Sequence, residues 1–329
     1  MKKIFIAVLA LAAVAACNKA EVVEQNPGNA IGFDNVFVNN ATKSVDDPSF
    51  DADNMFDDFA VYGFVEGAEL FNGTTVSKEI SNDDLKDTEW KYTGTQYWIA
   101  GAKYNFSAVA PVTDKKWEKT AADTDGVTLT FTNDGTQDLL YAKTDEIEGE
   151  VSGNDVVSFQ FRHVLSKVKL SFENEYNASN ATIQVRDIKI VNAYATGNVA
   201  LDANTTWTAQ AGKLLLEFGN AAVTGADALE PFGFNEAVES YKELLIIPGG
   251  VEGGYVIEFV VDLLVNGTKV TDYEHTAKVD FTPVAGNCYD IKATINASNI
   301  DPAHAQEPIQ FTVAALPGWT DKDQTATIQ

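Results

Sequence analysis

Alternation of apolar and polar residues with a period of two is the feature that most limits how this chain can fold. The clearest run covers residues 255–265, where one face of a strand would carry Tyr255, Ile257, Phe259, Val261, Leu263 and Val265. Asn266-Gly267 follows at once, and both residues accept the positive φ angles of a tight hairpin turn. A second run covers residues 164–172. Because helical periodicity is nearly absent, the sequence predicts an all-β fold.

Turn signals recur along the whole chain. Short strands separated by frequent turns favour β-sandwiches. An acidic, glycine-containing stretch at 146–155 is poor in large apolar residues and predicts a boundary between domains 30–153 and 154–329. Residues 221–243 are the least regular and predict a short helix or a long loop. The predicted turns and loop boundaries are Asn72-Gly73, Asp125-Gly126, Asp134-Gly135, Gly249-Gly250 and Gly253-Gly254.

The N-terminus has the pattern of a secretory signal, with Lys2 and Lys3 before an apolar run that ends at Ala16. That run is shorter than the roughly 20 residues that a membrane-spanning helix needs. Small residues before Cys17 resemble the bacterial lipobox, which predicts a signal peptide over 1–16 and acylation of Cys17, with palmitate among the acyl chains. An ordinary signal peptide with a chance cysteine is the alternative. The polar segment 17–29 predicts a flexible tether.

The net charge and the residue after Cys17 both favour a location at the cell surface. The net charge of −25 disfavours binding to nucleic acid and suits a solvated surface protein. Asn18, rather than an aspartate, follows Cys17, which favours the outer membrane over retention in the inner membrane. The sequence therefore predicts a lipoprotein on the outer membrane, exposed at the cell surface.

Residues that could carry catalysis do not form any recognisable group. Once Cys17 is acylated, Cys288 has no partner for a disulfide, and we expect it to be a small core residue. His163, His275 and His304 are far apart, and His163 is expected to pack or hydrogen-bond within its strand. Phosphate-binding, dinucleotide and nucleophile-elbow motifs are absent. We therefore expect no enzymatic activity, no catalytic residue and no cofactor.

Metal binding is also not predicted. Acidic residues cluster at 51–58, and Asp123-Thr124-Asp125-Gly126 matches only part of a calcium loop, since the distal glutamate is missing. Solvated turns are the favoured interpretation, and weak calcium binding stays open. Trp98 is expected in the core, whereas Trp117 and Trp207 lie in polar stretches and are the pair expected to be more exposed.

Both ends of the mature chain predict strands. Removing a terminal strand from a sandwich exposes a sheet edge and an apolar groove, which another strand can fill. The apolar residues of these two candidate exchangeable strands are Ile31, Phe33 and Phe37 near the N-terminus and Ile309, Phe311 and Val313 near the C-terminus.

Several stretches follow one another in a characteristic order: 31–33 with 41–43, 59–64, 90–92, 97–106 with 108–111, 161–168, 245–249 and 309–319. Together they resemble the fimbrillin-like family of Bacteroides-type bacteria, which includes the type V pilins and Mfa-like fimbrial lipoproteins. The resemblance implies two tandem transthyretin-like β-sandwich domains, outer-membrane lipidation and, in polymerising members, proteolytic loss of the first strand. A neighbouring subunit then donates a strand into the vacated groove.

One departure from the family concerns maturation. The best-known polymerising members are cut by an arginine-specific protease, but no arginine precedes Arg162 here. Cleavage between Lys43 and Ser44 would release the first strand, although Lys43 is equally compatible with a plain surface position. Without a cut, the protein would be an anchor, a tip component or a non-polymerising adhesin.

Two functions follow as expectations. The first is a fimbrial subunit or fimbria-associated adhesion lipoprotein, whose partners would be other fimbrial subunits and a host or bacterial surface receptor. The second is a glycan-binding outer-membrane lipoprotein that does not polymerise, which needs an exposed aromatic platform. Extracellular hydrolysis is the weakest alternative because no acid–base pair stands out.

Overall fold

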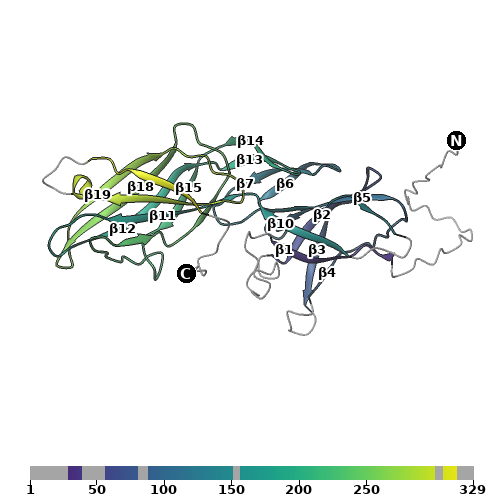
Figure 1. Cartoon of the computed structure of the whole chain (residues 1–329), viewed down its shortest axis with the longest axis horizontal. Helices are drawn as coiled ribbons and strands as arrows, with labels where there is room; N and C mark the ends of the chain where they lie inside the picture. The colour runs from purple at the N-terminus through teal and green to yellow at the C-terminus, as the bar shows by residue number, and fades with distance from the viewer. Residues whose placement is uncertain (1–28, 39–55, 81–87, 151–155, 301–306, 317–329) are drawn as a thin grey trace, which may run out of the picture.

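The computed structural model describes residues 29–38, 56–80, 88–150, 156–300 and 307–316. These residues confirm the all-β prediction: they form strands throughout, with one short helix, α1 (Ala297–Ile300). Figure 1 shows an elongated molecule with the later strands at one end and the earliest strands at the other. No helix among the described residues is long and apolar enough to cross a membrane.

The first sheet is a closed ring. Its strands follow the order β2-β3-β4-β1-β10-β8-β5-β9, and β2 also pairs with β5, which joins the two sides of the sheet. Closure leaves the ring strands without free edges and encloses an aromatic core. The strands are β1 (Phe33–Val38), β2 (Asp58–Val65), β3 (Ala68–Ile80), β4 (Thr88–Lys91), β5 (Lys103–Ala110), β8 (Leu140–Lys143), β9 (Ile147–Glu148) and β10 (Val157–His163).

The turn predicted at Asn72-Gly73 is wrong. The β2–β3 hairpin turns instead at Glu66-Gly67, where the φ angles are 49° and 77°. Gly73 lies inside β3, at a register shift between the pairs Val61↔Thr74 and Tyr62↔Asn72, and has φ of 73°. A positive φ serves a β-bulge as well as a turn, so the local sequence did not distinguish the two.

A four-stranded sheet lies in the middle of the molecule (Figure 1). Its order is β14-β13-β7-β6, so it combines strands from both sides of the predicted boundary at 153/154. The Asp125-Gly126 turn is confirmed, since it separates two of its strands. The strands are β6 (Trp117–Ala122), β7 (Val127–Thr132), β13 (Thr196–Leu201) and β14 (Thr205–Ala211).

Two further sheets enclose a shared apolar core in the C-terminal part. One has the order β16-β11-β20-β21, with β17 also paired to β11, and the other has the order β15-β12-β18-β19. The first contains β11 (Ser166–Asn174), β16 (Ala237–Glu239), β17 (Leu244–Ile246), β20 (Cys288–Ile295) and β21 (Phe311–Leu316). The second contains β12 (Ala181–Ala193), β15 (Leu214–Gly219), β18 (Tyr255–Val265) and β19 (Thr268–Val279).

The strongest strand and hairpin prediction is confirmed in detail. β18 spans 255–265, and its alternate residues from Tyr255 to Leu263 are buried. Asn266 and Gly267, with φ of 48° and 75°, turn the chain into β19. The irregular stretch 221–243 is a long loop that contains only β16 and isolated bridges.

The buried side chains form three clusters. One fills the closed ring and one fills the C-terminal pair of sheets. The third joins them, because it combines Leu129 and Tyr141 with Val199, Leu245 and Cys288. β10 follows the predicted boundary but pairs with β1 and β8 of the closed ring. The tandem transthyretin-like description and the division at 153/154 stay predictions.

Candidate strand-exchange site

The first terminal strand, β1, lies inside the closed ring. It pairs in parallel with β10 over four positions and touches β4 through the single pair Phe33↔Trp90. The residues just before it are also bonded: Ile31 N donates to Gln96 O (2.8 Å), and Trp98 N donates to Asn29 O (2.9 Å). The segment is therefore held on both sides.

Phe33 places one aromatic ring at the centre of this core. Its side chain is 2% exposed. Five other rings surround it with centroid distances between 5.4 and 6.3 Å, mostly in edge-to-face geometry, which aromatic pairs favour. They belong to Phe59, Phe71, Tyr92, Phe106 and Phe159. Withdrawal of β1 would leave a gap between β4 and β10, floored by these rings.

A tyrosine hydrogen bond holds the residues just before β1 in place. The Tyr92 hydroxyl donates to the carbonyl of Ile31 at 2.7 Å. Burial raises the pKa of Tyr92, so the hydroxyl keeps its proton and its donor role around neutral pH. Ile31 itself is buried.

The second terminal strand, β21, lies at a sheet edge. It pairs antiparallel with β20, from Cys288↔Leu316 to Ala293↔Phe311, and no described strand pairs with its other side. Phe311 and Val313 are half-buried against the C-terminal core, while Ile309 is buried. The Phe311 ring meets the Phe259 ring edge-on at 6.0 Å.

Both predicted terminal strands therefore exist, but they are held differently. Removing β1 would open a closed ring, whereas β21 could leave by breaking one ladder. Phe37 pairs with Gln160 in the β1–β10 ladder. Cys17, Lys43 and Ser44 lie outside the described residues, so acylation and cleavage stay predictions.

Three of the residues noted in the sequence, His163, Cys288 and Asp58, are buried. His163 is buried and its Nδ1 contacts Asp138 Oδ2 at 2.5 Å, which confirms the hydrogen-bonding expectation. Cys288 is buried, also as expected. Asp58 accepts hydrogen bonds from the backbone of Val112 (2.7 Å) and Thr113 (3.0 Å). No trio of His, Cys, Asp and Glu side chains in the described ranges is arranged to hold a metal.

The expectation for Trp117 is wrong. Its side chain is 3% exposed, because the ring packs inward and its Nε1 donates to Pro111 O at 2.7 Å. Trp207 is half-buried, and its Nε1 donates to Val164 O at 3.2 Å. Trp98 is buried as expected. The described tryptophans thus provide no exposed platform for stacking a sugar ring.

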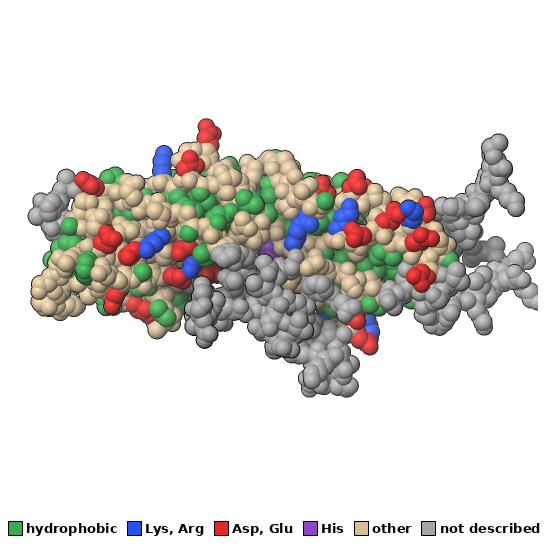
Figure 2. Space-filling view, in the orientation of Figure 1, with side chains coloured by type: hydrophobic (Ala, Val, Ile, Leu, Met, Phe, Trp, Pro, Cys, Tyr) green, Lys and Arg blue, Asp and Glu red, His purple; other side chains and the backbone are tan. Residues whose placement is uncertain are grey.

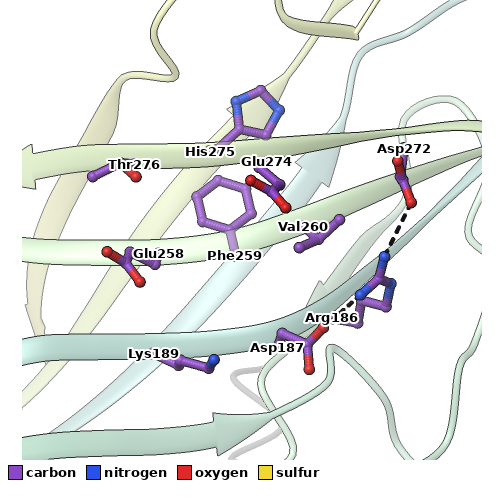
Figure 3. Close-up of a pocket in the computed structure, with 10 residues that line it drawn as sticks. All are labelled: Arg186, Asp187, Lys189, Glu258, Phe259, Val260, Asp272, Glu274, His275 and Thr276. Carbon is purple, nitrogen blue, oxygen red and sulfur yellow. Dashed lines mark hydrogen bonds and ion pairs between the residues drawn. The ribbon is translucent and has the colours of Figure 1, made fainter.

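A hollow of about 460 Å³ lies against β12, β18 and β19 (Figure 3). Arg186 forms ion pairs there with Asp187 (2.5 Å), Asp262 (3.0 Å) and Asp272 (3.3 Å). Lys269 also pairs with Asp262 at 2.8 Å. These contacts satisfy the cations within the protein. Figure 2 likewise shows acidic and basic side chains interspersed over the visible face.

Comparisons with known proteins agree with this architecture. The sequence profile of the fimbrillin-like family matches residues 42–314. A proposed cell adhesion protein from Bacteroides uniformis has 15% identity and a TM-score of 0.51, with 89% of this chain and 99% of that chain covered. Another from Bacteroides ovatus has 13% identity and a TM-score of 0.50, with 89% and 98% covered. The TM-scores indicate a shared fold, and the low identities support no statement beyond the fold. No curated protein sequence matches the chain significantly.

Proposed function

Because the chain belongs to the fimbrillin-like family, we propose that it is a fimbrial subunit or fimbria-associated surface adhesion protein that assembles by donor-strand exchange. Its role is structural rather than enzymatic. The observation that carries this proposal is the position of Phe33, which fills the centre of the N-terminal core from a terminal strand. A strand that supplies so much of a core leaves a well-defined acceptor site when it departs.

The acceptor site has both elements of strand recognition. β10 would offer a free parallel edge for backbone hydrogen bonds, since its ladder with β1 would be vacant. The exposed rings would offer an apolar floor for alternate side chains of the incoming strand. The first element supplies affinity, and the second selects a strand with apolar residues at every second position.

β21 is the proposed donor. Its inward residues, Phe311 and Val313, alternate with the exposed Thr312 and Ala314. Its departure breaks one ladder and leaves every other described strand paired. A donor strand must leave at low cost and carry an alternating apolar face, and β21 meets both requirements.

Membrane anchoring, proteolytic maturation and binding partners are part of the same proposal. Acylation of Cys17 would hold the protein on the outer membrane, and cleavage between Lys43 and Ser44 would free β1 for departure. Partners would be other fimbrial subunits and a host or bacterial receptor. For the alternative of a non-polymerising glycan-binding lipoprotein, the described tryptophans offer no exposed ring, and the exposed aromatic side chains among the described residues are Phe234 and Tyr241.

A reversible cross-link tests the exchange. Asp34 and Ser158 are register partners in the β1–β10 ladder, and both side chains are exposed. The double variant Asp34→Cys/Ser158→Cys should form a disulfide that locks β1 in place. Oxidised protein on cells should give no detergent- and heat-resistant oligomer ladder, and reductant should restore the ladder.

The single variant Asp34→Cys is the matched control and should assemble like wild type in both redox states. Equal ladders from the locked variant would rule out exchange at β1. A parallel Lys43→Ala variant reports on maturation: loss of ladders together with a longer N-terminal fragment supports cleavage there, and unchanged ladders count against it.

A further inference from the structure

One titratable side chain, His275, lies in the core of the C-terminal part. His275 lies on β19 with 8% of its surface exposed, and its Nε2 has no hydrogen-bond partner among the described residues. An imidazole nitrogen buried without a partner is costly, and the cost rises steeply if the ring gains a proton.

His275 is linked to β21 through one ring. It stands opposite Phe259 in the β18–β19 ladder and stacks on that ring, with centroids 5.3 Å apart and planes at 26°. The Phe311 ring of β21 meets the same Phe259 edge-on. The three rings form a continuous column from β19 to β21, and Figure 3 shows the first two side by side. Departure of β21 would remove one end of the column and admit water toward His275.

The charged groups near His275 line the hollow on the other face of its sheet: Arg186, Asp187, Lys189, Glu258, Asp272 and Glu274. On β19, the neighbours on the core side are Tyr273, the titratable group of that face, and Ala277. Glu274 lies beside it in the strand but alternates to the opposite face. The other titratable side chains in the buried core cluster are the phenols of Tyr255 and Tyr289, and the aromatic rings that contact Phe259 from the facing strands are Phe172 and Phe311.

We propose that protonation of His275 loosens β21 from β20, so that mild acid makes the C-terminal strand available for exchange. The loosening concerns the strand itself, and only its use in assembly rests on the proposed function. Through Phe259, His275 is connected to β21, the described terminal strand that can leave without opening the closed ring.

The direction of the effect follows from linkage. Burial lowers the pKa of His275 below its usual 6.5 in the closed structure. When β21 departs, the ring is hydrated and its pKa returns toward the usual value, so opening takes up a proton. The closed state is fully favoured above that value and loses stability as pH falls through it. Between about pH 7.5 and about pH 5.5, the population of the open state should rise by up to about tenfold.

Hydrogen exchange on the full mature chain, kept monomeric, tests this directly. After correction for intrinsic exchange rates, amides of Phe311–Leu316 should lose protection over that pH range, by up to about tenfold, whereas amides of β18 should not change. In His275→Phe and His275→Gln variants, the pH dependence should vanish. A His163→Gln variant is the matched control and should keep it.

If the hydrogen-exchange protection of β21 amides in the wild type did not change with pH, the proposal would be overturned, even if neither His275 variant folded. So would an unchanged pH dependence in a folded His275 variant. Oligomer ladders at the two pH values are a separate measurement: acid loosening of β21 without ladders would leave this inference intact and count against donor-strand exchange.

Discussion

Truncation of Phe33 should show how much of the N-terminal core depends on the first strand. Phe33→Ala removes a 2%-exposed ring that contacts five others, so little surrounding structure can collapse into the cavity. Core Phe→Ala changes cost about 3–5 kcal/mol, and the extra aromatic pairs place this one near the upper end, at about 5 kcal/mol.

Urea unfolding followed by tryptophan fluorescence is the suitable assay, because Trp90 and Trp98 lie in the same core as Phe33. With a slope of about 2 kcal/mol per molar urea, the midpoint of that transition should fall by about 2.5 M. Phe311→Ala is the control on the other terminal strand. Its ring is half-buried, so its loss should cost only about 1–2 kcal/mol, in the C-terminal transition. A loss below about 1.5 kcal/mol for Phe33→Ala would refute the central role assigned to β1.

Two further substitutions test contacts that link distant parts of the chain. A Cβ on Gly126 would lie 1.9 Å from Leu201 O, so Gly126→Ala should lower the free energy of unfolding by about 3 kcal/mol or more, measured by thermal unfolding. Gly94 has open space around it, so Gly94→Ala should cost only about 1 kcal/mol. Similar losses for the two variants would mean that the turn at Gly126 is not in close contact with the backbone at Leu201. Asp262 is buried between Arg186 and Lys269, so Asp262→Asn should lower the free energy of unfolding by about 3 kcal/mol in a denaturant titration. Asp272 lies at an exposed end of the same ion-pair network, so Asp272→Asn should change stability little. Equal effects of the two substitutions would contradict the burial of the Asp262 charge.

Local patterns were sufficient to predict the strands and several turns. β18 and its Asn266-Gly267 turn follow from residues within a few positions of one another, because side-chain alternation and positive φ angles are properties of the local chain. The terminal strands were found in the same way, and so was their apolar face. The hydrogen bond of His163 was also expected from its strand position.

Long-range pairing decided what the local patterns left open. The β2–β5 ladder closes the first sheet, and this closure makes β1 an internal strand rather than an edge. Trp117 was expected on the surface because its neighbours in sequence are polar, but packing across the sheets buries it. Gly73 was expected in a turn, yet the partner strand makes it a bulge.

The sequence by itself determined an all-β chain with an alternating apolar strand at each end, because period-two patterning is readable along a single segment. Only the tertiary structure decided that one end completes a ring while the other borders a sheet, and that His275 is linked to the latter through Phe259, with its Nε2 lacking a hydrogen-bond partner among the described residues. Those outcomes depend on which segments, far apart in sequence, come to lie side by side, and no local pattern carries that information.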